Sequence, residues 1–285
     1  MPGRSARAAL TAEQRMQLAQ AMVLVRRMSQ VLNDGIDRAG LSEVRGNAEI
    51  RVCLALYRGG ALRPRDLQDA AGLTSGGLTK LLDRLQAAEL VRRSDRGSAT
   101  DGRAVEVRLT NAGRRTVTRL IDVIDAGHDD VRPFAKEILM LVEACGGGPS
   151  GSIEPCVDLI PCLARLGSTL IESFTGTPGS ATSIDYSSLI VLCHASLEGG
   201  CRPGSLMELL DLSSGGATKL LDRLEHDGLI RRDYGSVDSD RRAVMVNVTA
   251  RGRTVMTHAL TRASAHLDEL WVAHHWLAEG VSVRR

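Results

Sequence analysis

The chain has 285 residues, of which 43% are apolar and 25% are charged, and its formal net charge is +2. This composition is typical of a folded protein of one to three domains and argues against wholesale disorder. The sequence contains no run of eighteen apolar residues and no secretory signal at its N-terminus, so we expect a cytoplasmic protein with no membrane partner. A net charge this small neither requires nor excludes a nucleic-acid partner.

One twelve-residue stretch occurs twice in nearly identical form. Thr74–Leu85 reads TSGGLTKLLDRL, and Ser213–Leu224 reads SSGGATKLLDRL. An ungapped alignment of residues 63–114 with residues 202–253 gives 25 identities in 52 positions. This period is too long for a solenoid repeat, so each copy is predicted to be a domain and the chain to be a tandem duplication.

The two copies are separated by a stretch rich in glycine and serine, which lacks periodic apolar residues and is typical of a flexible linker. We therefore predict domain 1 over residues 1–145, a linker over 146–155 and domain 2 over 156–285.

The same order of elements is predicted in each copy from apolar periodicity and turn residues. In copy one, helices are expected over 11–37, 47–58, 65–71 and 75–88, strands over 90–93 and 104–109, and a last helix capped by Thr110 and running to about residue 144. In copy two, the corresponding helices are 157–174, 184–198, 205–210 and 214–227, the strands are 229–232 and 243–248, and the last helix runs from a cap at Thr249 to about residue 279. The fold class is therefore mainly α with small β-hairpin wings, as two tandem winged helix–turn–helix domains with additional helices of the dimerisation type.

The repeated stretch combines an apolar face with an unusual first turn. Leucines at 78, 81, 82 and 85 share one helical face, which is expected to pack on the preceding helices. Two glycines open the helix although each costs about 1 kcal/mol relative to alanine. Close approach to a DNA backbone would explain them, because a helix N-terminus also favours phosphate.

In a winged helix, the second helix of the helix–turn–helix enters the major groove and the hairpin reaches adjacent phosphates or the minor groove. Charged helix faces are usually only solvated, so a single lysine or arginine is weak evidence for DNA binding. The complete arrangement occurs twice, and this repetition favours DNA binding. The predicted DNA-binding residues in these helices and first wing strands are Ser75, Gly76, Thr79, Lys80, Arg84 and Arg93 in copy one, and Ser214, Gly215, Thr218, Lys219, Arg223 and Arg232 in copy two.

The wing segments carry a family resemblance. Residues 90–93, 101–104 and 107–113, and more closely residues 228–232, 240–243 and 248–252, resemble the wing signature of the multiple-antibiotic-resistance regulator (MarR) family. The resemblance covers roughly residues 45–120 and 184–260. It implies a bacterial transcription regulator, usually a repressor, whose members dimerise through their terminal helices. Many members release DNA when a small, often phenolic, molecule binds or when a cysteine is oxidised.

The resemblance also implies roles for the wing loop. Arg103 and Arg242 correspond to the family's wing-tip arginine, with Arg241 beside the latter, and Asp101 and Asp240 would orient it. Two departures stand out. This chain has two winged helices where the family has one, and copy one has Glu89 where copy two has Gly228. Because glycine supplies a left-handed helix stop, the first helix is expected to end differently and its wing to sit differently.

These features predict an intrachain pseudo-dimer that reads a near-palindromic operator, with half-site centres about one DNA turn apart. Further homodimerisation, an aromatic or phenolic effector and a repressor role are part of the same prediction.

Other classes of function remain as alternatives. No P-loop, G-x-G-x-x-G, H-E-x-x-H or G-x-S-x-G motif occurs, so neither an enzyme nor a cofactor is expected. The histidines near the C-terminus lack metal-ligand spacing, and no metal is expected. A winged-helix protein–protein module is one alternative. A redox-sensing regulator that uses Cys145 and Cys156, the cysteines flanking the linker, is another.

Overall fold

The computed structural model describes residues 10–44, 47–71, 73–95, 105–149, 184–235 and 244–279. Their contacts divide the chain into two compact units. Among these residues, unit 1 contains 10–30, 133–149 and 184–278, and unit 2 contains 31–132 together with residue 279.

Unit 2 has the element order expected of copy one. Its elements are the end of α1 (Ala12–Arg38), η1 (Ser42–Val44), α2 (Asn47–Gly59), β1 (Ala61–Leu62), α3 (Pro64–Ala71), α4 (Ser75–Ala87), β2 (Val91–Asp95), β3 (Val105–Leu109), α5 (Asn111–Ala126) and the start of α6 (His128–Ala144). The antiparallel sheet has the order β1-β3-β2, with Val91 opposite Leu109. The predicted helices and hairpin are confirmed, whereas β1 was not predicted because two residues are too short to show an alternating pattern.

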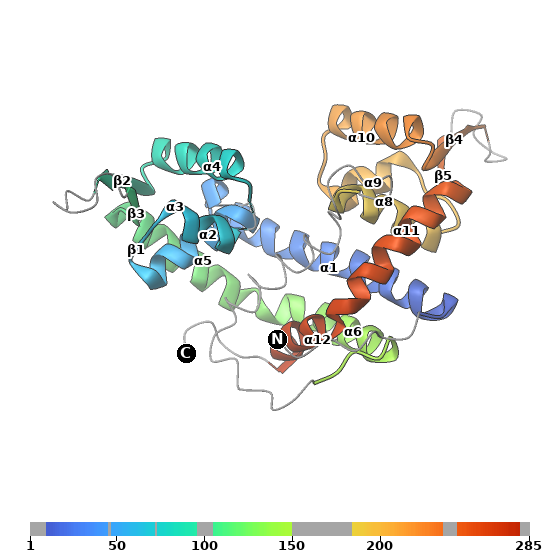
Figure 1. The fold of residues 1–285 in the computed structure, drawn as a ribbon, viewed down its shortest axis with the longest axis horizontal. Coiled ribbons are helices and arrows are strands. Elements are labelled where there is room, and N and C mark those ends of the chain that lie inside the picture. The colour runs from blue at the N-terminus through green and yellow to red at the C-terminus, as the bar shows by residue number, and fades with distance from the viewer. Residues whose placement is uncertain are drawn as a thin grey trace. The chain divides into compact units, whose positions relative to one another are not determined.

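Unit 1 repeats this order in the second half of the chain (Figure 1). It contains α8 (Tyr186–Leu197), α9 (Pro203–Leu210), α10 (Ser214–His226), β4 (Ile230–Tyr234), β5 (Val244–Val248), α11 (Ala250–Ala263), η2 (Ser264–His266) and α12 (Leu267–Glu279). An isolated bridge between Cys201 and Val246 occurs where unit 2 has β1. The helix expected over residues 157–174 lies outside the described residues.

The apolar face of the repeated helix lies in the core, as predicted. Leu78, Leu81, Leu82 and Leu85 of α4 are all buried, as are Ala217, Leu221 and Leu224 of α10. The base of each wing is held by a threonine cap. Thr110 accepts a hydrogen bond from the Gly113 amide at 2.9 Å, and Thr249 accepts one from the Gly252 amide at 3.0 Å.

The last helix of each copy is interrupted, contrary to the single helices predicted. In copy one, α5 ends and α6 begins around Gly127, whose ψ of 0° departs from helical geometry. In copy two, the short η2 turn separates α11 from α12, and the Ser264 hydroxyl donates to the Thr261 carbonyl at 2.7 Å. Helical periodicity continues across such short irregularities, so the apolar pattern does not reveal them.

The C-terminal end of α4 corrects a second expectation. Glu89 adopts φ = 58°, the left-handed conformation that Gly228 adopts with φ = 70° in copy two. In copy one the amides of Glu89 and Leu90 donate to the carbonyls of Gln86 and Leu85. The equivalent bonds link Gly228 to Glu225 and Leu229 to Leu224. Both helices therefore end in the same C-capping motif, and copy one tolerates a side chain in a conformation that favours glycine.

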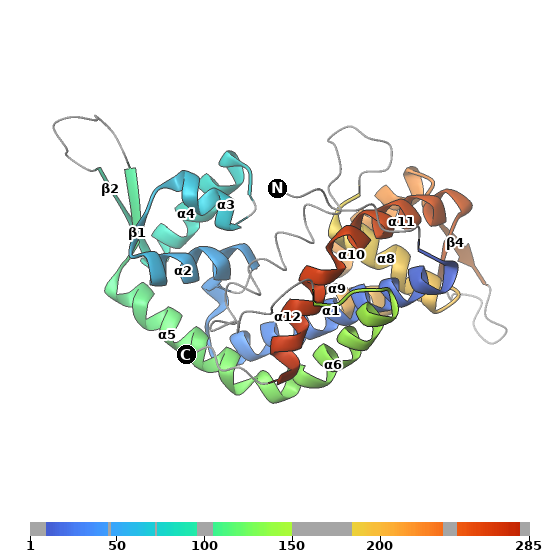
Figure 2. The ribbon, with the colours of Figure 1, turned by 60° about the horizontal axis from the view of Figure 1, so that its bottom comes forward.

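Unit 1 combines helices from both halves of the sequence. Within it, Gln14 on α1 donates to the Ala144 carbonyl at 3.2 Å, and Gln20 donates to Glu137 on α6 at 3.0 Å. Trp271 of α12 donates to Glu143 of α6 at 2.8 Å. Figure 2 shows α1, α6 and α12 running close together. The compact units thus do not follow the boundary predicted from the repeat, because α1 and α6 pack with the second copy.

The beginning of the predicted linker has a structural role. Gly146 has φ = 84° and ends α6, while the Gly147 amide donates to the Val142 carbonyl at 2.9 Å. The Gly148 amide donates to Asp268 of α12 at 3.2 Å. Residues 146–149 therefore connect α6 to α12 within unit 1, and the rest of the predicted linker lies outside the described residues.

Among the helices that the structure describes, none is long and apolar enough to cross a membrane.

Candidate nucleic-acid interface

The first turns of α4 and α10 have the same capping geometry. Thr74 accepts a hydrogen bond from the Gly77 amide, and Ser213 accepts one from the Gly216 amide, each at 3.2 Å. The first amide groups of a helix have no intrahelical partner and favour an anion. Each first turn is therefore suited to approach a phosphate.

The paired glycines have separate explanations. A Cβ at Gly77 or Gly216 would lie 3.3 Å from the capping hydroxyl, a tight contact that favours the second glycine of each pair. A Cβ at Gly76 or Gly215 would meet nothing within 4 Å among the described residues. Internal packing therefore does not require Gly76 or Gly215. A partner outside the unit remains a physical reason for them.

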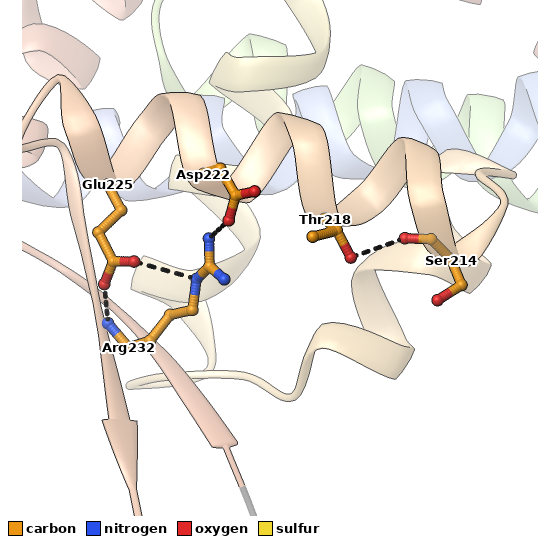
Figure 3. Close-up of polar contacts among 5 residues, drawn as sticks. All are labelled: Ser214, Thr218, Asp222, Glu225 and Arg232. Atoms are coloured by element: carbon orange, nitrogen blue, oxygen red, sulfur yellow. Dashed lines mark hydrogen bonds and ion pairs between the residues drawn. The ribbon is translucent and has the colours of Figure 1, made fainter.

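The exposed face next to these glycines carries a threonine and a lysine in each copy. The hydroxyls of Thr79 and Thr218 donate to the carbonyls one turn back, at 3.0 and 2.9 Å, and both side chains are exposed (Figure 3 shows Thr218 with Ser214). Lys80 and Lys219 are also exposed, and neither forms an ion pair with any residue that the structure describes. These two lysines are thus available to a phosphate or a guanine edge.

The arginine one turn further along each helix is already paired. Arg84 forms an ion pair with Glu49 in the first turn of α2. Arg223 lies 2.5 Å from Asp185, the N-cap of α8, and also donates to the Ser188 hydroxyl at 3.0 Å. The Arg84 guanidinium therefore links α4 to α2, the first helix of the set α2, α3 and α4. The Arg223 guanidinium links α10 to the start of α8, the first helix of the set α8, α9 and α10.

The second arginine of β2 and of β4 forms an ion pair with the preceding helix, α4 or α10. Arg93 donates to Asp83 at 2.8 Å. In copy two, Arg232 pairs with Asp222, and its Nε lies 3.3 Å from Glu225, as Figure 3 shows. These contacts hold the wing strand against the helix.

The remaining predicted residues belong to the wing tips. Arg103, Asp101, Asp240, Arg241 and Arg242 lie outside the described residues. Their predicted contact with DNA and their orientation stay predictions.

Three residues in this region were missed by sequence reasoning: Glu49, Asp185 and Ser188. Asp185 carries a detectable signal, because an aspartate directly before an apolar helix is a preferred N-cap. Neither its pairing with Arg223 nor that of Glu49 with Arg84 has a sequence signal, because the partners are 38 and 35 residues apart.

Unit 2 also contains a pocket of about 500 Å³ beside α4. Its lining residues are Asn33, Ser42, Glu43, Glu49, Arg84, Leu85 and Ala88. The Arg84–Glu49 pair thus forms part of the pocket wall, and a ligand there would contact the C-terminal half of α4.

The described cysteines are poor candidates for a thiolate switch. Cys53, Cys145, Cys193 and Cys201 are all buried with free thiols. Burial raises the pKa of Cys53 to about 12 and that of Cys201 to about 11, and it raises the pKa of Cys145 as well. The Cys145 thiol donates to the Gln14 carbonyl at 3.2 Å. Cys156 lies outside the described residues, and no group of three or more potential metal ligands occurs among those that are described.

One comparison with known proteins supports the assignment of the first winged helix. The model of the MarR family matches residues 46–104. Among solved structures, the chain is similar to the crystal structure of NadR in complex with 4-hydroxyphenylacetate, at 23% identity over 50% of this chain and 94% of that chain, with a TM-score of 0.34. No curated protein matches the chain. Residues 46–104 are therefore similar to a MarR-family winged helix–turn–helix domain.

Proposed function

We propose that the chain is a sequence-specific regulator of transcription, acting as a repressor, that binds double-stranded DNA through α4 and α10. One observation carries this proposal. Both helices present the same exposed residues, with a hydroxyl cap at the same position and with an outer glycine that internal packing does not require. A partner that contacts both first turns accounts for this coincidence, and DNA is the partner that fits the lysines and amide groups there.

The second copy is included as a winged helix because its details match those of the first. Its elements follow the same order, and its hairpin pairs Ile230 with Val248 as the first pairs Val91 with Leu109. A Cβ at Gly252 would lie 2.0 Å from the Leu229 carbonyl oxygen, and one at Gly113 would lie 2.0 Å from the Leu90 carbonyl oxygen. Such a close contact between the last helix and the wing strand supports common descent of the two copies.

The pseudo-dimer is supported by the composition of unit 1. Arg26 of α1 donates to the Leu209 carbonyl at 2.9 Å, and Gln30 donates to the Glu208 carbonyl, so the N-terminal helix satisfies the C-terminal end of α9. In a dimer of separate chains such contacts would be intermolecular. Here one polypeptide supplies both sides, and we infer that the operator is read without a second chain.

Release by a small effector is the second part of the proposal, and the pocket beside α4 supports it. Its volume lies in the range of small-molecule sites, and a ligand bound there would contact the Arg84–Glu49 ion pair in its wall. A ligand bound there would contact the helix that we propose reads DNA.

The direct test is selection from a library of randomised duplexes by the whole chain at about 150 mM salt. We expect a short, near-palindromic motif whose half-site centres are about one turn apart. A folded chain that enriches no motif would contradict the proposal. It would favour the protein–protein module, which has no need of DNA.

The redox alternative receives less support from the structure. The pKa of Cys145 is raised, and its thiol is hydrogen-bonded and buried, so little thiolate is available to react. DNA binding that is unchanged by mild oxidation, with a Cys145→Ser variant as control, is the expected outcome.

A further inference from the structure

Each recognition helix is tied to the first helix of its set by one ion pair. We call these pairs the latches: Arg84–Glu49 in copy one and Arg223–Asp185, with Ser188, in copy two. In each copy the arginine occupies the same helical position, whereas the carboxylate differs in type and position. Glu49 lies inside the first turn of α2, and Asp185 is the cap that precedes α8.

The latches lie at the end of the helix away from its capped first turn. In the helix–turn–helix arrangement, the N-terminal residues of the recognition helix contact base edges. Lys80 and Lys219 lie one helical turn closer to the N-terminus of the helix than Arg84 and Arg223. A phosphate approaching either arginine would also approach its carboxylate, which repels it. The charge offered to DNA at the latch is therefore largely cancelled.

The pairs are too exposed to contribute much to global stability. The Arg84 side chain is 72% exposed and those of Arg223 and Asp185 are 52% and 49% exposed, whereas Glu49, at 13%, is largely buried. Exposed pairs of this kind stabilise a fold only slightly. They can nevertheless bias the angle of a helix. α2 contacts α3 and α3 contacts α4, so the latch adds a direct link between the first and third members of the set.

We propose that Arg84 and Arg223 are positioning residues, which set the angle of the recognition helices through Glu49 and Asp185 and do not themselves bind DNA. This inference rests on the proposed DNA-binding function. It makes a specific claim, namely that the carboxylates matter for DNA affinity as much as the arginines do.

The test uses the whole chain and the duplex obtained by selection. Glu49→Gln and Asp185→Asn remove the negative charges, and asparagine retains the capping ability of Asp185. Each change is expected to weaken DNA binding about three- to fivefold, as should Arg84→Ala and Arg223→Ala. The double variant Glu49→Gln/Arg84→Ala should be no weaker than either single variant. The reversed pair Glu49→Arg/Arg84→Glu should recover part of the loss.

The salt dependence separates positioning from direct contact. Loss of a phosphate contact reduces the slope of log K against log salt by about 0.9. We expect Lys80→Ala to change this slope, and Arg84→Ala and Glu49→Gln to leave it unchanged, with the same unfolding midpoint for all variants. If Glu49→Gln binds as tightly as the unmodified chain while Arg84→Ala is weaker with a reduced slope, Arg84 binds phosphate and the inference is wrong. If the unmodified chain selects no duplex, the proposed function itself fails.

Discussion

The regions around α4 and α10 have the same exposed residues but differ in the helix ends and ion pairs beneath them. The exposed Gly-Gly, threonine, lysine and arginine positions are identical, and the caps are a threonine and a serine. Beneath them, copy one ends its helix at a strained Glu89 and pairs its wing arginine with one carboxylate. Copy two uses Gly228 and two carboxylates.

This difference shows where the constraint on the sequence acts. Gly76 and Gly215 are surrounded by open space, so packing would allow other residues there. Both copies nevertheless have glycine at this position. Positions with a clear structural task, such as the helix stop and the carboxylate partner of the latch, have changed. The common surface is therefore best explained by a common external partner, and the following changes test this comparison from the largest expected effect to the smallest.

Met22→Ala tests whether α1 belongs to the second copy's unit. Met22 is fully buried, and a truncation at such a site costs about 2–5 kcal/mol. We expect hydrogen-exchange protection to fall in residues 184–278 and to persist in residues 47–126. The matched control is Met140→Ala, because the Met140 side chain is 62% exposed and its removal should change little. Loss confined to residues 47–126 would contradict the observed unit 1.

Gly113→Ala and Gly252→Ala test whether the two wings are attached alike. The added methyl group would lie 2.0 Å from a backbone carbonyl oxygen, so the last helix must move, at a cost of about 3 kcal/mol. Equal losses of unfolding free energy in the two units are expected from denaturant titration of each variant. Gly204→Ala is the control, since a Cβ there meets nothing within 4 Å. A well-tolerated alanine at either site would show that this wing is not in close contact with its helix.

Acidification should destabilise unit 1 more than unit 2. Burial lowers the pKa of His274 in unit 1 to about 4, and the pKa of His194 is also lowered by burial. Between pH 6.5 and 4 the unfolded chain binds a proton that folded His274 does not, so stability falls as the pH falls through this window. The loss reaches about 2 kcal/mol at pH 5.

The only histidine of unit 2 is His128, which is partly exposed. Hydrogen-exchange protection measured at pH 7 and pH 5 should therefore change more in unit 1. His274→Gln should reduce that change. An equal response of both units, unaffected by this substitution, would contradict the role of His274.

Glu89→Gly tests the difference between the two helix stops. Relief of the left-handed strain should stabilise copy one by about 1 kcal/mol, and Gly228→Ala should destabilise copy two by a similar amount. Thermal unfolding of both variants measures this directly. Opposite signs are expected, and stabilisation by both changes would mean that the two stops are not equivalent.

Gly76→Ala and Gly215→Ala separate stability from binding. Alanine should leave the fold intact or stabilise the helix by up to about 1 kcal/mol, because the space is open. DNA affinity should nevertheless fall, because the methyl group lies on the face proposed to approach DNA. A stabilised variant with unchanged DNA affinity would remove the outer glycine as support for the interface.

The sequence was sufficient to predict the helices and hairpins, but it did not identify which residues pair with one another in the fold. Apolar periodicity located the recognition helices and both hairpins, and cap preferences identified Thr110 and Thr249. The left-handed Glu89 was not foreseen, because propensity favours glycine there and two backbone hydrogen bonds override that preference. The short β1 strand and the interruptions at Gly127 and Ser264 were too small to disturb the periodic pattern.

Helical periodicity also made part of the candidate interface predictable. The exposed side chains of one helix face follow from its period, and Lys80 and Lys219 lie where expected. Arg84, Arg223, Arg93 and Arg232 have similar sequence signatures but are paired with carboxylates. Whether a surface cation is free depends on residues brought near by tertiary packing, and sequence spacing contains no information about that. The packing of α1 with the second copy was hidden for the same reason.

The central claim is that both copies read the same half-site, and nuclease footprinting of the selected duplex tests it most directly. The footprints of the unmodified chain, Lys80→Ala and Lys219→Ala would be compared at equal ionic strength. We predict two similar half-sites about one turn apart, with each variant losing protection at one half-site only, and at different ones. Unrelated half-sites, or loss of the same half-site in both variants, would contradict the account.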